Sequence, residues 1–145
     1  MINYALKFYR ISGAERSLFF RTYMLGLFYS FYVLLIPNRI IFKRLGVKGV
    51  ESSTNLTEEK RVQVQILERI MRRVIRFSPW RISCFARAII AKRVLKKRNI
   101  PSTIYFGISK DGNRKLTAHA WLRSGDIIVT GKEELIRFAP VLFFT

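Results

Sequence analysis

The chain has 145 residues, half of them hydrophobic, with 27 Lys and Arg against nine acidic residues. This length allows one packed core and is short for two independent domains, and the hydrophobic content excludes a disordered tail. The single Cys excludes an internal disulfide and a cysteine-rich zinc site. One unpaired thiol favours a reducing compartment, so we expect a cytoplasmic protein.

The net charge of +18 must attract an anionic partner, such as nucleic acid, a membrane surface or an acidic peptide. The basic residues are interleaved with apolar ones in "RIMRRVIR" and "AKRVLKKRN", which is the pattern of a solvated helix face. The sequence has no zinc finger, helix-turn-helix signature or RNA-binding motif. We therefore expect general electrostatic attraction and no sequence-specific binding of nucleic acid.

Residues 1–50 are an apolar segment that predicts helices, and no charged residue occurs from Thr22 to Asn38. A membrane-spanning helix needs about 20 apolar residues, whereas this uncharged run is shorter, contains tyrosines and ends at Pro37. We favour a helix that packs on the rest of the protein or on a partner. The alternative is a helix in the membrane interface, with tyrosine and arginine side chains at the headgroups.

Residues 51–56 are polar and predict a linker, and residues 57–145 are expected to form the core domain. Asn55 or Thr57 can cap a helix whose apolar side chains repeat at helical spacing as far as Phe77. Pro79 ends this helix because it disfavours helical geometry at the residue before it. A second helix contains Cys84 and ends at the cationic stretch "KKRNIP".

After Pro101 the apolar residues no longer recur every three or four positions but every second position, which is the spacing of a strand. "STIYFGIS" predicts a strand with Ile104, Phe106 and Ile108 on one face, and the Asp-Gly of "KDGNRK" predicts a hairpin turn. "LTAHAWLR" and "DIIVTG" predict two further strands, joined at "SGD". Helices followed by an antiparallel meander indicate an α+β fold, in which helices pack on a small antiparallel sheet.

The only Cys and the only His, Cys84 and His119, are candidates for a catalytic pair. If Ser83 caps the second helix, Cys84 lies in its first turn, where backbone N–H groups and the helix dipole stabilise a thiolate. If Ser78 is the cap, Cys84 lies one turn further along the helix, where the end N–H groups and the dipole stabilise a thiolate much less. His119 shares a strand face with Trp121, among others. Composition alone favours a buried structural Cys and a structural His over catalysis.

The segment "SPWRISCFARAIIAKRVLKKRNIPSTIYFGISKDGNRKLTAHAWLRSGDIIVTG" resembles the transglutaminase-like cysteine-peptidase core of the lasso-peptide leader peptidases. The likeness consists of a Trp shortly before a Cys that opens a helix, the "LKKRNIPSTIYFGI" passage from helix to strand, and "AHAWLRSGD" before a short apolar strand. The N-terminal "ALKFYRISGAERSLFFRTYMLGLFY" resembles the helical preface of the stand-alone members.

This resemblance implies a permuted papain-like fold with Cys84 as the nucleophile, His119 as the general base and an acid that orients the imidazole. Asp126 is our candidate for the acid because its residue type and region match the family, although it lies at the turn. Glu133 is the second choice. A backbone carbonyl or Thr130 is a third possibility, because the position opposite His119 falls near Thr130 or Gly131.

The resemblance also implies a reaction and a set of partners. The expected reaction is removal of the leader peptide from a lasso-peptide precursor, with a separate leader-binding protein and an ATP-dependent macrolactam cyclase that takes the product. With no P-loop and no metal-binding cluster, we expect no cofactor. Two alternatives stay open: a basic membrane-surface or nucleic-acid-binding protein without catalysis, and an acyl transferase or amidase on the same fold.

Overall fold

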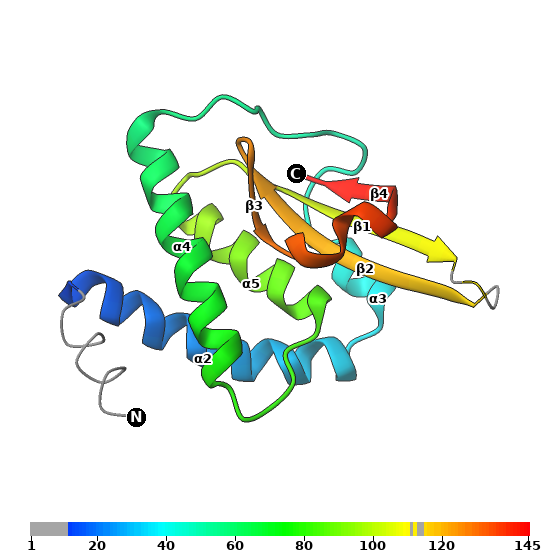
Figure 1. Ribbon diagram of the computed structural model, residues 1–145, viewed down its shortest axis with the longest axis horizontal. Coiled ribbons are helices and arrows are strands. Elements are labelled where there is room, and N and C mark those ends of the chain that lie inside the picture. Colours follow the sequence, from blue (N-terminus) through cyan, green and yellow to red (C-terminus); the bar gives the residue numbers. More distant parts are fainter. Residues whose placement is uncertain (1–11, 111, 113–114) are drawn as a thin grey trace.

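The computed structural model describes residues 12–110, 112 and 115–145, and it shows helices packed on a small antiparallel sheet (Figure 1). The predicted α+β fold is confirmed. The helices are α2 (Gly13–Leu35), α3 (Asn38–Phe42), α4 (Glu58–Phe77) and α5 (Cys84–Lys97), followed by β1 (Thr103–Lys110), β2 (Leu116–Ser124), β3 (Ile127–Thr130), the short 3-10 helix η1 (Lys132–Arg137) and β4 (Ala139–Phe144).

The four strands lie in the order β3-β2-β1-β4 and all pair antiparallel. The first three strands follow the predicted meander, whereas β4 was not predicted. It pairs with β1, far away in the sequence, with Ile104 opposite Phe144. The chain around Lys48 joins the far side of β4 through an isolated bridge to Phe144. The expected linker is also tied to the sheet, because the amide of Ser52 donates to the hydroxyl of Thr103 at 2.8 Å.

The two predicted core helices form at the expected positions. Thr57 caps α4 and accepts a hydrogen bond from the amide of Lys60 at 3.4 Å, and the helix ends before Pro79. Ser83 caps α5 and accepts from the amide of Ala86 at 3.2 Å. Cys84 is therefore the first residue of α5, which decides between the two starts that the sequence allowed.

Helix α2 uses one face to pack against α4 and α5, as Figure 1 shows. Its buried residues recur every three or four positions and are Leu18, Thr22, Gly26 and Tyr29. A Cβ at Gly26 would lie 3.2 Å from Cδ1 of Ile82, so the helix approaches its neighbours closely at this point. By length and composition α2 could cross a membrane, with a mean hydropathy of 1.4 in its most apolar window.

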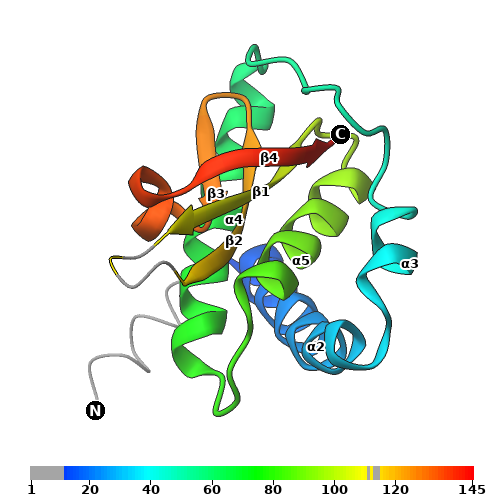
Figure 2. The ribbon, with the colours of Figure 1, turned by 90° about the vertical axis from the view of Figure 1, so that its right-hand side faces the viewer.

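The two faces of the sheet have different neighbours. Ile104, Ala120 and Leu122 belong to the hydrophobic core that includes α4 and α5. On the other face Tyr105 and Trp121 stack across β1 and β2, with ring centroids 5.4 Å apart. Figure 2 shows α5 on one side of the sheet and η1 on the other. The sheet therefore separates the main core from a smaller aromatic cluster under η1.

The close approach at Gly26 predicts that a large side chain there weakens the docking of α2. We expect Gly26→Leu to reduce the free energy of unfolding by about 1–3 kcal/mol, because overpacking forces the neighbouring helices apart. Gly13→Leu is the matched control, since nothing lies within 4 Å of a Cβ at that end of the same helix. Thermal unfolding followed by circular dichroism measures both. Equal melting temperatures would contradict the tight packing of α2.

Candidate active site

His119 lies in the middle of β2 with its imidazole enclosed by aromatic rings and is only 9% exposed. Its ring centroid lies 5.0 Å from that of Phe138 and 6.1 Å from that of Trp121. Nε2 is 3.0 Å from the carbonyl oxygen of Gly131. A carbonyl only accepts, so this bond places a hydrogen on Nε2, and in the neutral imidazole the lone pair is then on Nδ1.

The carbonyl reaches the imidazole because the chain turns sharply where β3 ends. Thr130 is the last residue of β3 and pairs with Leu122. Gly131 then adopts φ 81°, a left-handed conformation that favours glycine. A Cβ at Gly131 would lie 2.9 Å from Nε2 of His119 and 2.8 Å from the oxygen of Ala120. Glycine is therefore required both for the backbone conformation and for the close contact.

Cys84 lies at the N-terminus of α5 and is partly buried. The backbone amides in the first turn of α5 have no hydrogen-bond acceptor within the helix. The side chain of Ser83 accepts a hydrogen bond from only one of them, the amide of Ala86. The amides of Cys84 and Phe85 point out of the helix end, together with the positive end of its dipole. Such a helix end can stabilise the oxyanion that forms when a thiol attacks a carbonyl group.

Cys84 and His119 belong to elements that pack against each other, α5 and β2. The ring of Phe85 lies 5.1 Å from that of Phe106, which is paired with Ala120, the residue next to His119. The side chain of His119, however, is on the sheet face opposite to that of Ala120, which packs into the core with α5. Cys84 packs against this same core, so the thiol and the imidazole start from opposite faces of β2.

Asp126 lies in the turn between β2 and β3, at the opposite end of this hairpin from Gly131. Its carboxylate accepts a hydrogen bond from Nη2 of Arg61 at 2.8 Å, and its side chain is 60% exposed. The bond from Arg61 lowers the pKa of the Asp126 carboxyl below its usual value. The described contacts therefore join Asp126 to α4, whereas the oxygen that meets Nε2 of His119 belongs to the backbone.

The other two candidates for the orienting group are also placed. Glu133 is exposed on η1. The hydroxyl of Thr130 is buried and has no hydrogen-bond partner in the described part of the chain, so it does not hold the imidazole. Of the alternatives drawn from the sequence, a backbone carbonyl, that of Gly131, has a described hydrogen bond with His119.

Sequence reasoning missed the aromatic enclosure of His119. Phe138 follows η1, and no local pattern in "KEELIRFAP" shows that the chain folds back over β2. Trp121 was placed on the correct face by strand alternation, but its ring also covers Gly107, where a Cβ would lie 2.7 Å from Cζ3 of the indole. The sequence offered one signal of this contact, Gly107, since a glycine inside a strand often marks a place where another group approaches the backbone closely.

Residues 33–143 match the family profile described as the transglutaminase-like superfamily. The match covers most of the chain, and the protein belongs to this superfamily. Its fold fits a cysteine peptidase or an acyltransferase-type activity. The match begins inside α2, so it includes part of the apolar segment as well as the core. No curated protein and no solved structure gives a match to the chain.

The contact between Gly131 and His119 predicts a large cost for an added methyl group. Gly131→Ala must accept both a left-handed backbone and a Cβ 2.7 Å from Cβ of Trp121. The control is Gly49→Ala, with a similar φ of 77° and nothing within 4 Å of the added Cβ. We expect Gly131→Ala to be the less stable by about 1–3 kcal/mol in urea unfolding. If the two variants lost the same free energy of unfolding, the contact between Gly131 and His119 would be shown to tolerate the methyl group.

Proposed function

We propose that this protein is a cysteine endopeptidase that removes the leader peptide from a lasso-peptide precursor. Three points support the proposal: the superfamily match, the resemblance of residues 78–131 to the leader peptidases, and the position of Cys84 at the capped start of α5. The position of Cys84 carries the most weight. It puts the only thiol of the chain beside backbone amides that can stabilise the oxyanion formed at the attacked carbonyl.

In this proposal His119 is the general base and Gly131 takes the place of the acidic third member. The carbonyl of Gly131 keeps the hydrogen on Nε2, so in the neutral imidazole the lone pair that takes the proton of Cys84 is on Nδ1. For this step the thiol and the imidazole must approach each other around the edge of β2 beyond Thr130. When the base acts, the two groups must be within about 2.6–3.2 Å of each other or joined through one water.

The reaction then follows the chemistry of cysteine peptidases. Nδ1 of His119 takes the thiol proton, and the thiolate attacks the carbonyl carbon of the scissile peptide bond. Amides at the start of α5 stabilise the oxyanion. The C–N bond breaks, the imidazolium protonates the leaving amine, and the leader remains as a thioester on Cys84. Water deprotonated by His119 releases the leader as a carboxylic acid and restores the thiol.

The first product is a core peptide with a free α-amino group. Such an amine is the nucleophile that a macrolactam cyclase needs, which agrees with a cyclase that consumes ATP as the next partner. A separate leader-binding protein delivers the precursor in this scheme. The acyltransferase alternative shares every step up to the thioester and differs only in the acceptor, an amine instead of water.

The pairing of Cys84 with His119 can be tested without a substrate. Cys84 is the only cysteine, so alkylation by iodoacetamide reports on that thiol alone. An ordinary thiol has a pKa of about 8.5, and a thiolate–imidazolium pair reacts well below that pH. We expect His119→Ala to move the pH dependence of alkylation toward an ordinary thiol, while Thr130→Val leaves it unchanged. Identical profiles for His119→Ala and the parent protein would contradict the pair.

The peptidase activity is tested with the full-length chain, a leader-binding protein and a lasso-peptide precursor, and the products are identified by mass spectrometry. We expect Cys84→Ala and Cys84→Ser to abolish cleavage while the fold is retained. His119→Ala should reduce the rate by about 10²–10⁴-fold, the usual contribution of a general base. Cleavage by either Cys84 variant at the parent rate would end the peptidase proposal.

The same assay identifies the group that orients His119. We expect Asp126→Ala to stay close to the parent rate, because its carboxylate is paired with Arg61. Thr130→Val should also be tolerated, since it removes a hydroxyl that has no partner among the described residues. Strong loss in Asp126→Ala or Glu133→Ala would instead assign the third member to that acid. Transfer of the leader to an added amine, with no hydrolysis, would favour the acyltransferase alternative.

A further inference from the structure

The outer face of α2 carries a continuous row of exposed apolar side chains. These residues, which we call the α2 stripe, have exposed fractions between 39% and 79% and are Met24, Leu27, Phe28, Phe31, Leu34 and Leu35. They recur at helical spacing, opposite the buried residues of the same helix. An exposed apolar row of this length is typical of a binding surface and not of an ordinary solvent-exposed helix face.

The stripe is suited to lying along a surface and not to crossing a membrane. The inner face of α2 is held by the protein, since Gly26 approaches Ile82 and the ring of Tyr23 lies 5.1 Å from that of Trp80. To span a bilayer, α2 would have to leave these contacts and expose the core of the domain. The apolar side chains can enter a bilayer only as one side of a helix parallel to its plane.

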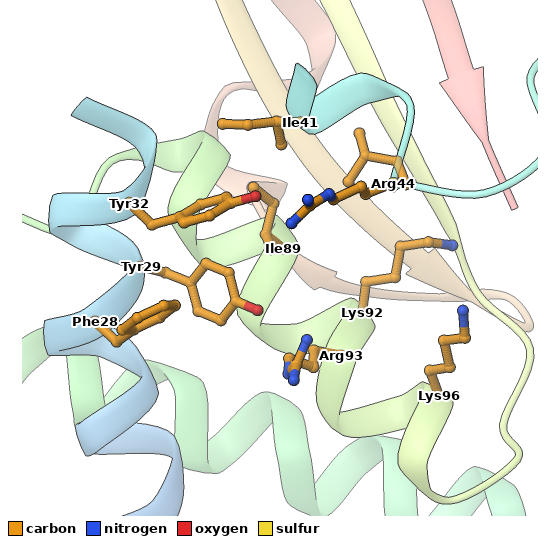
Figure 3. Close-up of a pocket in the computed structure, with 10 residues that line it drawn as sticks. Phe28, Tyr29, Tyr32, Ile41, Arg44, Ile89, Lys92, Arg93 and Lys96 are labelled. Carbon is orange, nitrogen blue, oxygen red and sulfur yellow. The ribbon is translucent and has the colours of Figure 1, made fainter. Parts of the chain in front are cut away.

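A strongly basic cavity opens beside the stripe, between α2, α3 and α5. It has a volume of about 290 Å³ and includes Phe28, which also belongs to the stripe. Figure 3 shows Arg44, Lys92, Arg93 and Lys96 around it, opposite the aromatic rings of α2. No acidic residue lines this cavity, and within the described residues none of its four cations forms an ion pair.

The cations crowd one another in this cavity. Nζ of Lys92 donates to the carbonyl of Ser102 at 3.1 Å, and this side chain is partly buried. Burial, followed by the charge of Lys96, lowers the pKa of Lys92 to about 8. A bound anion would relieve both effects, because it replaces lost hydration and offsets the repulsion between the two lysines.

We propose that the α2 stripe and this basic cavity together form a surface that binds anionic lipid bilayers. The stripe enters the boundary between headgroups and acyl chains, and the cavity receives a lipid phosphate. Apolar side chains beside lysine and arginine are the composition of helices that lie in the membrane interface. A second copy of this chain is a poor occupant, because the interface would bring together two proteins of net charge +18.

Vesicle flotation with the full-length protein tests the proposal. Vesicles of phosphatidylcholine alone are compared with vesicles in which phosphatidylglycerol supplies a third of the lipid, at about 0.1 M salt, where charges on the surface are partly screened. We expect binding to the anionic vesicles and little to the neutral ones. Repeating the measurement with Cys84→Ala keeps the result independent of catalysis, so that failure here and failure of the peptidase proposal can be told apart.

Two pairs of substitutions separate the two parts of the surface. Phe31→Gln with Leu34→Gln alters exposed side chains of the stripe, and Arg93→Gln with Lys96→Gln removes two charges from the cavity. Each pair should weaken binding about tenfold or more, as expected for lost insertion and for two fewer cations at an anionic surface. The charge-matched control, Lys132→Gln with Arg137→Gln, lies on η1 and should leave binding nearly unchanged.

Three outcomes would overturn the proposal. The first is failure of the parent protein to float with anionic vesicles. The second is unchanged binding in both substituted pairs, or equal loss in the η1 control, since general charge would then explain the attraction. The third is full competition by inorganic phosphate at concentrations that leave the salt screening unchanged, which would assign the cavity to a free phosphate.

Discussion

The alternation of side chains along β2 fixes the position of both the hydrophobic core and the candidate site. Ala120 and Leu122 point into the core with α4 and α5, so His119 and Trp121 must point to the opposite face. One strand therefore supplies both the hydrophobic contact that holds the helices and His119, the proposed base of the candidate site. A shift of register by one residue would exchange the two sets and would lose both the core and the site.

The end of β3 completes the site because the backbone turns where the strand stops. Gly131 leaves the ladder in a left-handed conformation, and its carbonyl meets Nε2 of His119. The role of an orienting acid can thus be taken by a main-chain group, whose position is set by the β2–β3 pairing. Asp126 at the other end of the hairpin instead links the sheet to Arg61 of α4.

Much of the local structure was predictable because its causes are local. Thr57 and Ser83 cap their helices through side chains that reach the third residue onward, a distance fixed by helix geometry. The alternation in β1 and β2 placed His119 with Trp121 for the same kind of reason. Strand β4 could not be predicted, because "APVLFF" becomes a strand through its pairing with β1, more than one element away in the chain.

The fold class, a capped helix that contains Cys84 and the face of β2 that carries His119 all followed from the sequence alone. It also determined the excess of positive charge, since these properties depend on residue types and on spacing along the chain. The folded structure was needed to show that α5 begins at Cys84, that Gly131 meets the imidazole and that Asp126 pairs with Arg61. It was also needed to show that one side of α2 stays uncovered beside a basic cavity. Most of these features join residues distant in sequence, and such contacts arise only when the helices and the sheet pack together.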